Sequence, residues 1–305
     1  MTGPSPAERL VDLLDLEEID LNIFRGDSPH ESLQRVFGGQ VAGQALVAAG
    51  RTVDDRRPVH SLHAYFLRPG IPGVPIVYQV ERVRDGRSFT TRRVIAVQRG
   101  RTIFNLTASF HLPEPGFDHQ LPMPDVPDPE SLPKLADEIR GHLGSLPEPL
   151  ERMARRQAFD LRYVERLRWN ASELEGVEPR SGVWMRAIGS LGDDPLVHTC
   201  ALTYASDMTL LDAVRIPVEP LWGPRSFDTA SLDHAMWFHR PFRADEWFLY
   251  QQESPIATGA RGLARGQIYD REGKLIVSVM QEGLFRAHDP DHTSRRTEAD
   301  GAASR

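Results

Sequence analysis

The alternation of apolar and polar positions predicts a chain built mainly of short strands, interrupted by a few helices. In the first part, residues 6–24 predict a short amphipathic helix followed by the extended segment LNIF. The small, apolar segment VFGGQVAGQALVAAG (36–50) predicts a buried helix that is opened by two glycines. Strand-like segments with turn signals between them follow. They cover residues 59–68, 74–83, 88–98 and 102–111.

The same order of elements begins again in the second half of the chain. Residues 113–150, with their Pro, Asp and Leu-Pro steps, predict a linker that contains a short helix at 133–142. A second long helix is expected from Pro195 to about Leu211. The polar tail from Asp289 is expected to be disordered. The strands expected in this half cover residues 159–165, 182–189, 230–240, 247–253, 260–269 and 274–286.

The two halves correspond to each other in pattern. Their last hairpins align without gaps, with Gly100 on Gly273, and an earlier strand ends in Arg-Pro in both, with Pro69 on Pro241. We therefore expect a duplicated α+β domain, in which an antiparallel sheet curls around one long apolar helix. The expected boundaries are 1–112 for the first domain, 113–156 for the linker, 157–288 for the second domain and 289–305 for the tail.

Composition narrows the function without identifying it. Apolar residues make up 40% and charged residues 26% of the 305 residues, as in ordinary soluble globular proteins. The net charge of −7 argues against broad binding to nucleic acid or to an anionic membrane. With the single cysteine Cys200, no intrachain disulfide can form, and no apolar run is long enough for membrane insertion. We therefore expect a cytoplasmic protein.

Asp207 is a carboxylate in an apolar setting. At helical spacing it shares a face of the second predicted helix with Thr203, Tyr204, Leu210 and Leu211. Burial on such a face raises the pKa of a carboxyl group unless hydrogen-bond donors surround it. Alternatively, Asp207 lies at a frayed helix end that faces water.

Gln281 and Ser231 are two further polar residues in strand segments. Gln281 shares a predicted apolar strand face with Val277 and Val279, so its amide needs partners. The aligned residue of the first half is Ala108, which is plain core. Alternatively, Gln281 is a core glutamine satisfied by backbone groups. Ser231 opens a strand, where a serine is usually a turn residue.

Other chemistries leave no signature in the sequence. It contains no G-x-S-x-G, no P-loop, no G-x-G-x-x-G and no Cys/His cluster, so we expect neither a metal nor a cofactor. His234 and His239 are five residues apart on one strand and face opposite ways, which does not make a metal pair. Cys200 is more typical of a small buried apolar residue than of a nucleophile.

Several segments together resemble the acyl-CoA thioesterase II family, the TesB-type enzymes. The resemblance covers roughly residues 8–288. It implies an α+β double hotdog fold, two tandem antiparallel sheets each wrapped around a long central helix, and hydrolysis of fatty acyl-CoA to a free acid and CoA. The segments that carry it are RVFGGQVAGQAL (35–46), HSLHAYFLRPG (60–70), YASD (204–207), LDHAMWFHRPF (232–242), ARG with its partner RG (260–266) and QEG (281–283).

The resemblance also implies the catalytic residues. The family uses an Asp, a Thr and a Gln that together hold the attacking water, and these match Asp207, Ser231 and Gln281 here. Serine at position 231 departs from the family pattern, because it keeps the hydroxyl but lacks the methyl group that fixes χ1. The role of the hydroxyl is expected to survive with looser positioning.

For the oxyanion we expect the backbone N–H groups of Gly38, Gly39 and Gln40 at the start of the first long helix. Glycines let a carbonyl group approach closely, and a helix N-terminus favours negative charge. Alternatively, Gly38 and Gly39 only permit tight helix–sheet packing. Seven arginines could meet the CoA phosphates, although a solvated hairpin face accounts better for most of them. They are Arg82, Arg84, Arg87, Arg92, Arg93, Arg99 and Arg101.

Two other functions fit parts of the pattern. A hotdog enoyl-CoA hydratase would need an Asp–His pair, for which His234 or His63 could serve. An acyl-CoA-binding module without turnover would keep the pocket but not need a complete catalytic set. We expect one active site per chain, because the first half has no acidic residue between Glu31 and Asp54. We also expect a homo-oligomer, a dimer or tetramer, because the strand edges of hotdog sheets often pair.

Overall fold

The computed structural model describes residues 3–29, 34–144, 157–165, 173, 175–222 and 227–287. The first half contains two helices and six strands among these residues. They are α1 (Pro6–Leu14), β1 (Glu17–Asp20), β2 (Ile23–Gly26), α2 (Gly38–Gly50), β3 (Val59–Phe66), β4 (Ile76–Asp85), β5 (Phe89–Gln98) and β6 (Arg101–His111). The short helices η1 (Pro129–Ser131) and α3 (Leu135–Leu143) follow.

The second half repeats the order of two strands, a long helix and four strands, and adds helix α6 and strand β9 after the long helix. Its described elements are β7 (Phe159–Tyr163), β8 (Arg180–Ala187), α5 (Pro195–Ser206), α6 (Asp212–Trp222), β9 (Phe227–Ser231), β10 (Asp233–Phe238), β11 (Phe248–Thr258), β12 (Arg261–Asp270) and β13 (Leu275–Ala287). The hairpin turns β5–β6 and β12–β13 both use a glycine with positive φ, +72° at Gly100 and +82° at Gly273. A residue with a side chain rarely adopts this conformation, which explains why these two positions align.

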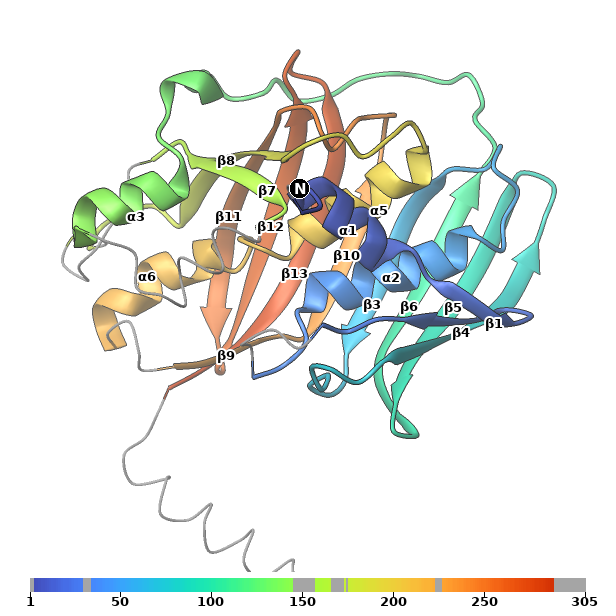
Figure 1. Ribbon diagram of the computed structural model, residues 1–305. Helices are drawn as coiled ribbons and strands as arrows, with labels where there is room; N and C mark the ends of the chain where they lie inside the picture. The colour runs from blue at the N-terminus through green and yellow to red at the C-terminus, as the bar shows by residue number, and fades with distance from the viewer. Residues whose placement is uncertain are drawn as a thin grey trace, which may run out of the picture.

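All described strands join into one 13-stranded sheet. Its order is β1-β2-β4-β5-β6-β3-β10-β13-β12-β11-β8-β7, and β9 pairs with β13. The halves meet at β3 and β10, which pair antiparallel with Ala64 opposite His234. The two long helices α2 and α5 lie side by side on the same face of this sheet, and α1 crosses them (Figure 1).

Most elements expected from the sequence are confirmed. The predicted linker helix is α3, and the strands lie where alternation indicates, except that the strand predicted at 230–240 is two strands broken at Leu232. The expected tail after Asp289 lies outside the described residues. The domain boundaries stay a prediction. No helix in the described ranges combines the length and apolarity needed to cross a membrane.

The second long helix ends earlier than predicted. α5 stops at Ser206, and Asp207 forms its C-cap. The Met208 N–H donates to the Ala205 carbonyl at 3.0 Å, which closes the helix with a tight turn. The prediction that this helix continues to about Leu211 is therefore wrong, and α6 was not predicted at all. Apolar periodicity alone does not distinguish a last helical turn from the buried turn that follows it.

Helices α2 and α5 pack antiparallel and very closely. Every residue of α2 from Gly39 to Ala49 is buried. A side-chain carbon on Gly39 would lie 2.4 Å from the Tyr204 carbonyl oxygen, and one on Gly43 would lie 3.1 Å from that of Cys200. The packing role considered for Gly39 is therefore real, although its partner is helix α5 and not the sheet. This packing places the start of α2 against the end of α5.

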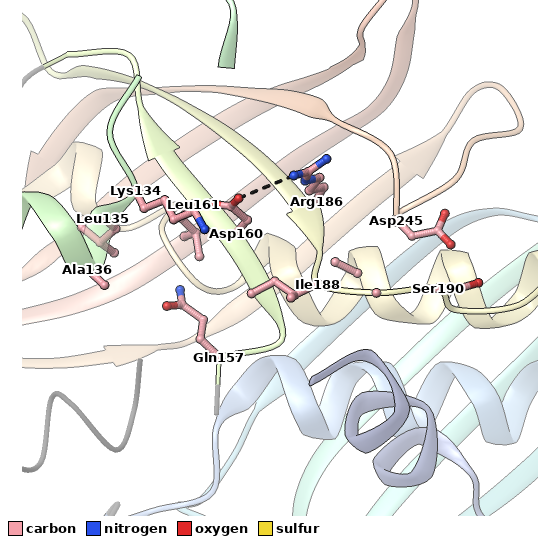
Figure 2. A pocket seen from close by; sticks show the side chains of 12 residues that line it. Lys134, Leu135, Ala136, Gln157, Asp160, Leu161, Arg186, Ile188, Ser190 and Asp245 are labelled. Carbon is pink, nitrogen blue, oxygen red and sulfur yellow. Dashed lines mark ion pairs between the residues drawn. The ribbon is translucent and has the colours of Figure 1, made fainter. Parts of the chain in front are cut away.

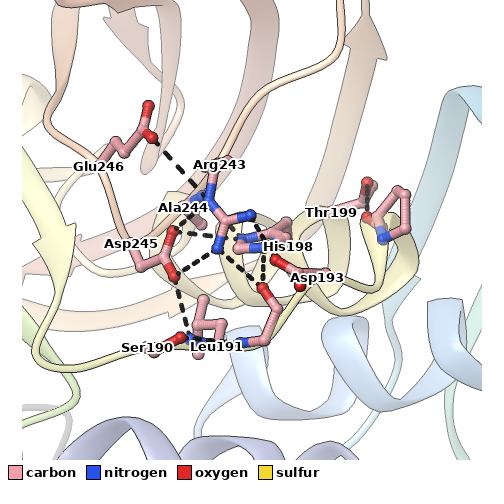
Figure 3. Close-up of polar contacts among 11 residues, drawn as sticks. Ser190, Leu191, Asp193, His198, Thr199, Arg243, Ala244, Asp245 and Glu246 are labelled. Atoms are coloured by element: carbon pink, nitrogen blue, oxygen red, sulfur yellow. Dashed lines mark hydrogen bonds and ion pairs between the residues drawn. The ribbon is translucent and has the colours of Figure 1, made fainter.

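The start of α5 is fixed by a separate polar cluster (Figure 3). Asp194 caps the helix by accepting the Leu196 N–H at 2.8 Å. The His198 ring uses both nitrogens, Nε2 toward the Gly192 carbonyl at 2.9 Å and Nδ1 toward the Ala244 N–H at 3.1 Å. Both ring positions of this buried histidine are thus satisfied, and they tie the loop before α5 to the loop before β11.

The glycine at the helix crossing yields a stability prediction. Gly39→Ala is expected to lower the free energy of unfolding by about 1–3 kcal/mol, because the new methyl group would overlap the Tyr204 carbonyl. Denaturant titration of the purified protein measures the change. Gly141→Ala is the matched control, because this helical glycine in α3 has nothing within 4 Å of its Cβ position. If both variants are as stable as the original chain, the close helix approach is not a constraint.

Candidate active site

The three residues predicted to be catalytic meet in the structure. Oδ1 of Asp207 accepts hydrogen bonds from Gln281 Nε2 at 2.6 Å and from Ser231 Oγ at 3.1 Å. They are separated by 24 residues from Asp207 to Ser231 and by 74 from Asp207 to Gln281. The helix end at Asp207 and the strands β9 and β13 therefore bring together side chains that are distant in sequence.

The two donors are placed by sheet register. Ser231 is the last residue of β9 and pairs with Gly283 on β13, two positions beyond Gln281. Gln281 pairs with Ala264 on β12 and is fully buried, on the same inner face as Val277 and Val279. Strand alternation therefore gave the correct face for Gln281, and its amide donates to the side chain of Asp207 and not to a backbone group.

The N-terminus of α2 adjoins the same carboxyl group. The first N–H groups of a helix have no partners within the helix. In α2, the N-cap residue Phe37 offers them no side-chain hydrogen bond, and the first turn has no acidic residue. The Gly39 N–H bonds to the Asp207 carboxyl group. A side-chain carbon on Gly38 would lie 2.6 Å from Asp207 Oδ2. The Gln40 side chain instead donates to the Asp27 carbonyl at 2.9 Å and anchors the helix start.

The surroundings of Asp207 shift its ionisation. Burial raises the pKa of Asp207 to about 6, and the hydrogen bonds from Gln281, Ser231 and the Gly39 N–H, with the positive charge of Arg35, oppose this only in part. Asp207 therefore does lie at a helix end, as the alternative held, but its carboxyl group is partly buried and hydrogen-bonded to Ser231 and Gln281. The carboxyl group is mainly ionised at neutral pH, and it can take up a proton at little free-energy cost.

A cavity of about 630 Å³ opens beside Asp207 and Ser231. Arg35 and Arg68 in its lining are exposed, and their guanidinium groups donate to the backbone carbonyls of Thr229 at 2.6 Å and Thr102 at 2.7 Å. Most of the remaining lining is apolar and comes from the first half of the chain. These apolar residues are Val36, Phe37, Val41, Phe66, Leu67, Ile103 and Phe104.

Two other cavities of similar size are not lined by any of the three residues predicted to be catalytic. One, of about 660 Å³, lies beside α3, β7 and the loop before α5 (Figure 2). Two charged residues of its lining, Arg186 and Asp160, pair with each other at 3.9 Å. The other, of about 640 Å³, is lined by Arg186 and Asp245 among others. The cavity beside Asp207 is distinguished by two of the predicted catalytic residues, Asp207 and Ser231, in its lining.

The arginines suggested for CoA do not line this cavity. Arg92, one of the seven, is buried and pairs with Asp85 at 2.6 Å, with further hydrogen bonds to Thr52. Sequence reasoning missed Arg35 and Arg68 as lining residues. Their signal was present, since both lie within the segments that carry the family resemblance.

Comparison with known proteins decides the family. The family model described as "Acyl-CoA thioesterase N-terminal domain" matches residues 27–111, and the one described as "Acyl-CoA thioesterase" matches residues 153–284. Human acyl-coenzyme A thioesterase 8 is 42% identical over 283 residues, which covers 90% of this chain and 88% of that protein. Acyl-CoA thioesterase 2 of Haemophilus influenzae is 41% identical over 280 residues, with 91% and 96% covered.

The chain belongs to the acyl-CoA thioesterase family.

Solved structures agree with this membership. Acyl-CoA thioesterase II TesB2 from Mycobacterium marinum superimposes with a TM-score of 0.77 at 45% identity, covering 92% of this chain and 99% of that one. A hot dog fold protein from Alicyclobacillus acidocaldarius gives 0.72 at 19% identity, which concerns the fold alone. The predicted resemblance, the double hotdog fold and the enzyme class, a thioester hydrolase, are thereby confirmed for this acyl-CoA thioesterase.

The raised pKa of Asp207 predicts a pH-dependent stability. The folded protein binds this proton more tightly than the unfolded chain, so ionisation of Asp207 destabilises the fold as the pH rises from about 4 to about 6. Asp207→Asn removes this effect. It is expected to be more stable than the original chain at pH 8 by about 1–3 kcal/mol, and equally stable near pH 4. Denaturant titrations at both pH values measure the difference.

Asp245 provides the matched control, because its pKa is shifted in the opposite direction from that of Asp207. Burial raises the pKa of Asp245, but the hydrogen bonds from Arg243 and the Leu191 N–H, with the charge of Arg243, outweigh it and lower the pKa. Asp245→Asn is therefore expected to destabilise the protein at pH 8. A stability gain from Asp207→Asn that is as large at pH 4 as at pH 8 would contradict the assigned ionisation.

Proposed function

We propose that this acyl-CoA thioesterase hydrolyses acyl-CoA to a free acid and CoA by direct attack of water, without a covalent intermediate. The observation that carries the mechanism is the convergence of Ser231 Oγ and Gln281 Nε2 on one oxygen of the partly buried Asp207 carboxyl group, at the wall of a largely apolar cavity. An attacking water needs a base for its proton and fixed groups that orient it, and this set provides both.

Asp207 acts as the general base. With a pKa of about 6 it is ionised at neutral pH and accepts the proton that the water loses as it attacks the thioester carbonyl. Ser231 and Gln281 orient the water and the carboxylate, because each also has hydrogen-bonding capacity beyond its bond to Oδ1. The protonated carboxyl group then supplies a proton to the departing thiolate of CoA.

The negative charge that develops on the thioester oxygen lies at the start of α2 in this proposal. The Gly39 N–H already bonds to Asp207, so the amides of Gly38 and Gln40 are the available donors. A helix N-terminus also favours negative charge through its dipole. The absence of a side chain at Gly38 leaves room for the carbonyl group beside Asp207.

The cavity suits an amphipathic substrate. Its apolar walls, formed by Phe37, Phe66 and Phe104 among others, would take the acyl chain. Arg35 and Arg68 are exposed in the same lining and would pair with the phosphates of CoA. The relatives with about 40% identity are named as acyl-CoA thioesterases, which supports the same substrate class here.

The geometry of the site offers little support for the two alternative functions, a hydratase and a module that only binds acyl-CoA. A hydratase would need a histidine paired with Asp207, but the His234 Nε2 lies 2.8 Å from Ser206 Oγ, and His63 is exposed with its ring against Trp237 at 5.2 Å. A module that only binds acyl-CoA would not need a poised base. The predicted cytoplasmic location and homo-oligomer remain proposals.

The role of Asp207 is tested by its amide variant. Asp207→Asn should fold and should lower kcat by about 10²-fold or more, the scale expected for loss of a general base. Release of free thiol from a panel of acyl-CoA chain lengths measures turnover. In the original enzyme kcat/KM should fall below about pH 6, because protonation of Asp207 removes the base. Nearly unchanged turnover by folded Asp207→Asn would remove Asp207 from the mechanism.

The hydroxyl at position 231 has its own test. Ser231→Ala should raise the activation free energy by about 1–3 kcal/mol, because one ligand of the water is lost from a partly buried site. Ser231→Thr keeps the hydroxyl and should retain activity. If the Ala and Thr variants both match the original enzyme in thiol release, the Ser231 hydroxyl does not hold the water.

A further inference from the structure

His234 lies directly beside Gln281 in the interior. Ala235 of β10 pairs with Met280 of β13, so the next positions in the same register are His234 and Gln281. Both side chains are completely buried, on the face that carries the helices. Facing residues on neighbouring strands have Cβ atoms about 4.5–5.5 Å apart, which is within reach for polar side chains.

Each of these side chains has one polar atom without a partner. Among the described residues, His234 Nδ1 and Gln281 Oε1 are buried and make no hydrogen bond. The other end of each side chain is engaged, His234 Nε2 with Ser206 Oγ at 2.8 Å and Gln281 Nε2 with Asp207 Oδ1 at 2.6 Å. Buried polar atoms are seldom left unsatisfied, so two such atoms on facing residues need a common explanation.

We propose that His234 is a positioning residue for the hydrolysis. Its ring carries the proton on Nδ1, and this N–H donates a hydrogen bond to Gln281 Oε1. This bond holds the amide of Gln281 in the orientation that directs Nε2 to Asp207. The inference deepens the proposed function, on which it rests, because it names the group that orients one of the three water-holding residues.

The alternative proton position leaves unsatisfied groups. With the proton on Nε2, His234 would present a lone pair to Gln281 Oε1, and neither atom would have a donor. If the amide then turned over to donate to His234, its oxygen would face the Asp207 carboxylate, and Asp207 would lose its closest donor. With the proton on Nδ1, the Ser206 hydroxyl, which also lies 2.8 Å from the Thr203 carbonyl, can donate to Nε2 instead.

His198 shows that this protein satisfies a buried histidine when its role is structural. His198 donates from Nε2 to the Gly192 carbonyl and accepts the Ala244 N–H at Nδ1 (Figure 3). Among the described residues, the His234 ring has no backbone partner at either nitrogen, and its free nitrogen is next to a side chain of the proposed catalytic set. Burial lowers the pKa of His234 to about 4, so the ring is neutral and a single proton must be assigned.

The ring proton can be observed directly. Nitrogen NMR of ¹⁵N-histidine-labelled full-length protein near neutral pH distinguishes a protonated Nδ1 from a protonated Nε2, and a His234→Asn sample assigns the signal. We expect protonation at Nδ1. Protonation at Nε2 overturns the proposal. This result does not depend on turnover, so it is separate from the Asp207→Asn test of the proposed function.

Two amide variants separate the ring nitrogens in function. His234→Asn can place a donor near the Nδ1 position, whereas His234→Gln places its amide near the Nε2 position. His234→Gln should lower kcat by about tenfold or more with KM nearly unchanged, and His234→Asn should recover most of the loss. The acid limb of kcat/KM should move to higher pH in His234→Gln, because Asp207 loses a bond that lowers its pKa.

A double variant tests whether His234 acts through Gln281. In a Gln281→Ala background, the added His234→Gln change should have little further effect on kcat, because His234 acts through Gln281. Equal losses in the Asn and Gln variants, an unmoved acid limb, or full additivity with Gln281→Ala would each overturn the proposal. His198→Gln is the control for loss of a buried histidine and should lower thermal stability without moving the acid limb.

Discussion

The close antiparallel approach of helices α2 and α5 is the constraint on which the site depends. It requires glycine at position 39, where a side chain would overlap the Tyr204 carbonyl of α5, and favours glycine at position 43, where a side-chain carbon would lie 3.1 Å from the Cys200 carbonyl oxygen. Because the helices are antiparallel, the positive end of α2 meets the negative end of α5, where Asp207 is the C-cap. The Gly39 N–H thereby compensates a carboxylate that its own helix would disfavour.

This arrangement divides the work between the two halves. The first half supplies the glycine-rich helix start and most of the apolar cavity, and the second supplies Asp207, Ser231 and Gln281. At the opposite end of the helix pair, the Leu196 side chain fills the space beside Gly50. The proposed chemistry therefore lies at one end of the helix pair, and apolar packing occupies the other end.

Sequence patterns predicted what depends on local periodicity, and failed where tertiary contacts decide. Strand alternation gave the inner face of Gln281 correctly, because a polar residue among valines is visible in the sequence. The same logic missed the end of α5 at Ser206, since a buried turn is as apolar as a buried helix. Sequence patterns also could not distinguish Arg92, which is buried in the interior, from Arg35, which lines the cavity. The partners of His234 depend on cross-strand register, which one strand does not reveal.

The most direct test of this division of labour is the number of acyl-CoA molecules bound per chain. Isothermal titration of the full-length protein with a non-hydrolysable acyl-CoA thioether counts the sites without turnover. One cavity built jointly by the two halves predicts saturation at one ligand per chain. Saturation at two equivalent ligands per chain would contradict the account, because each half would then carry a complete site of its own.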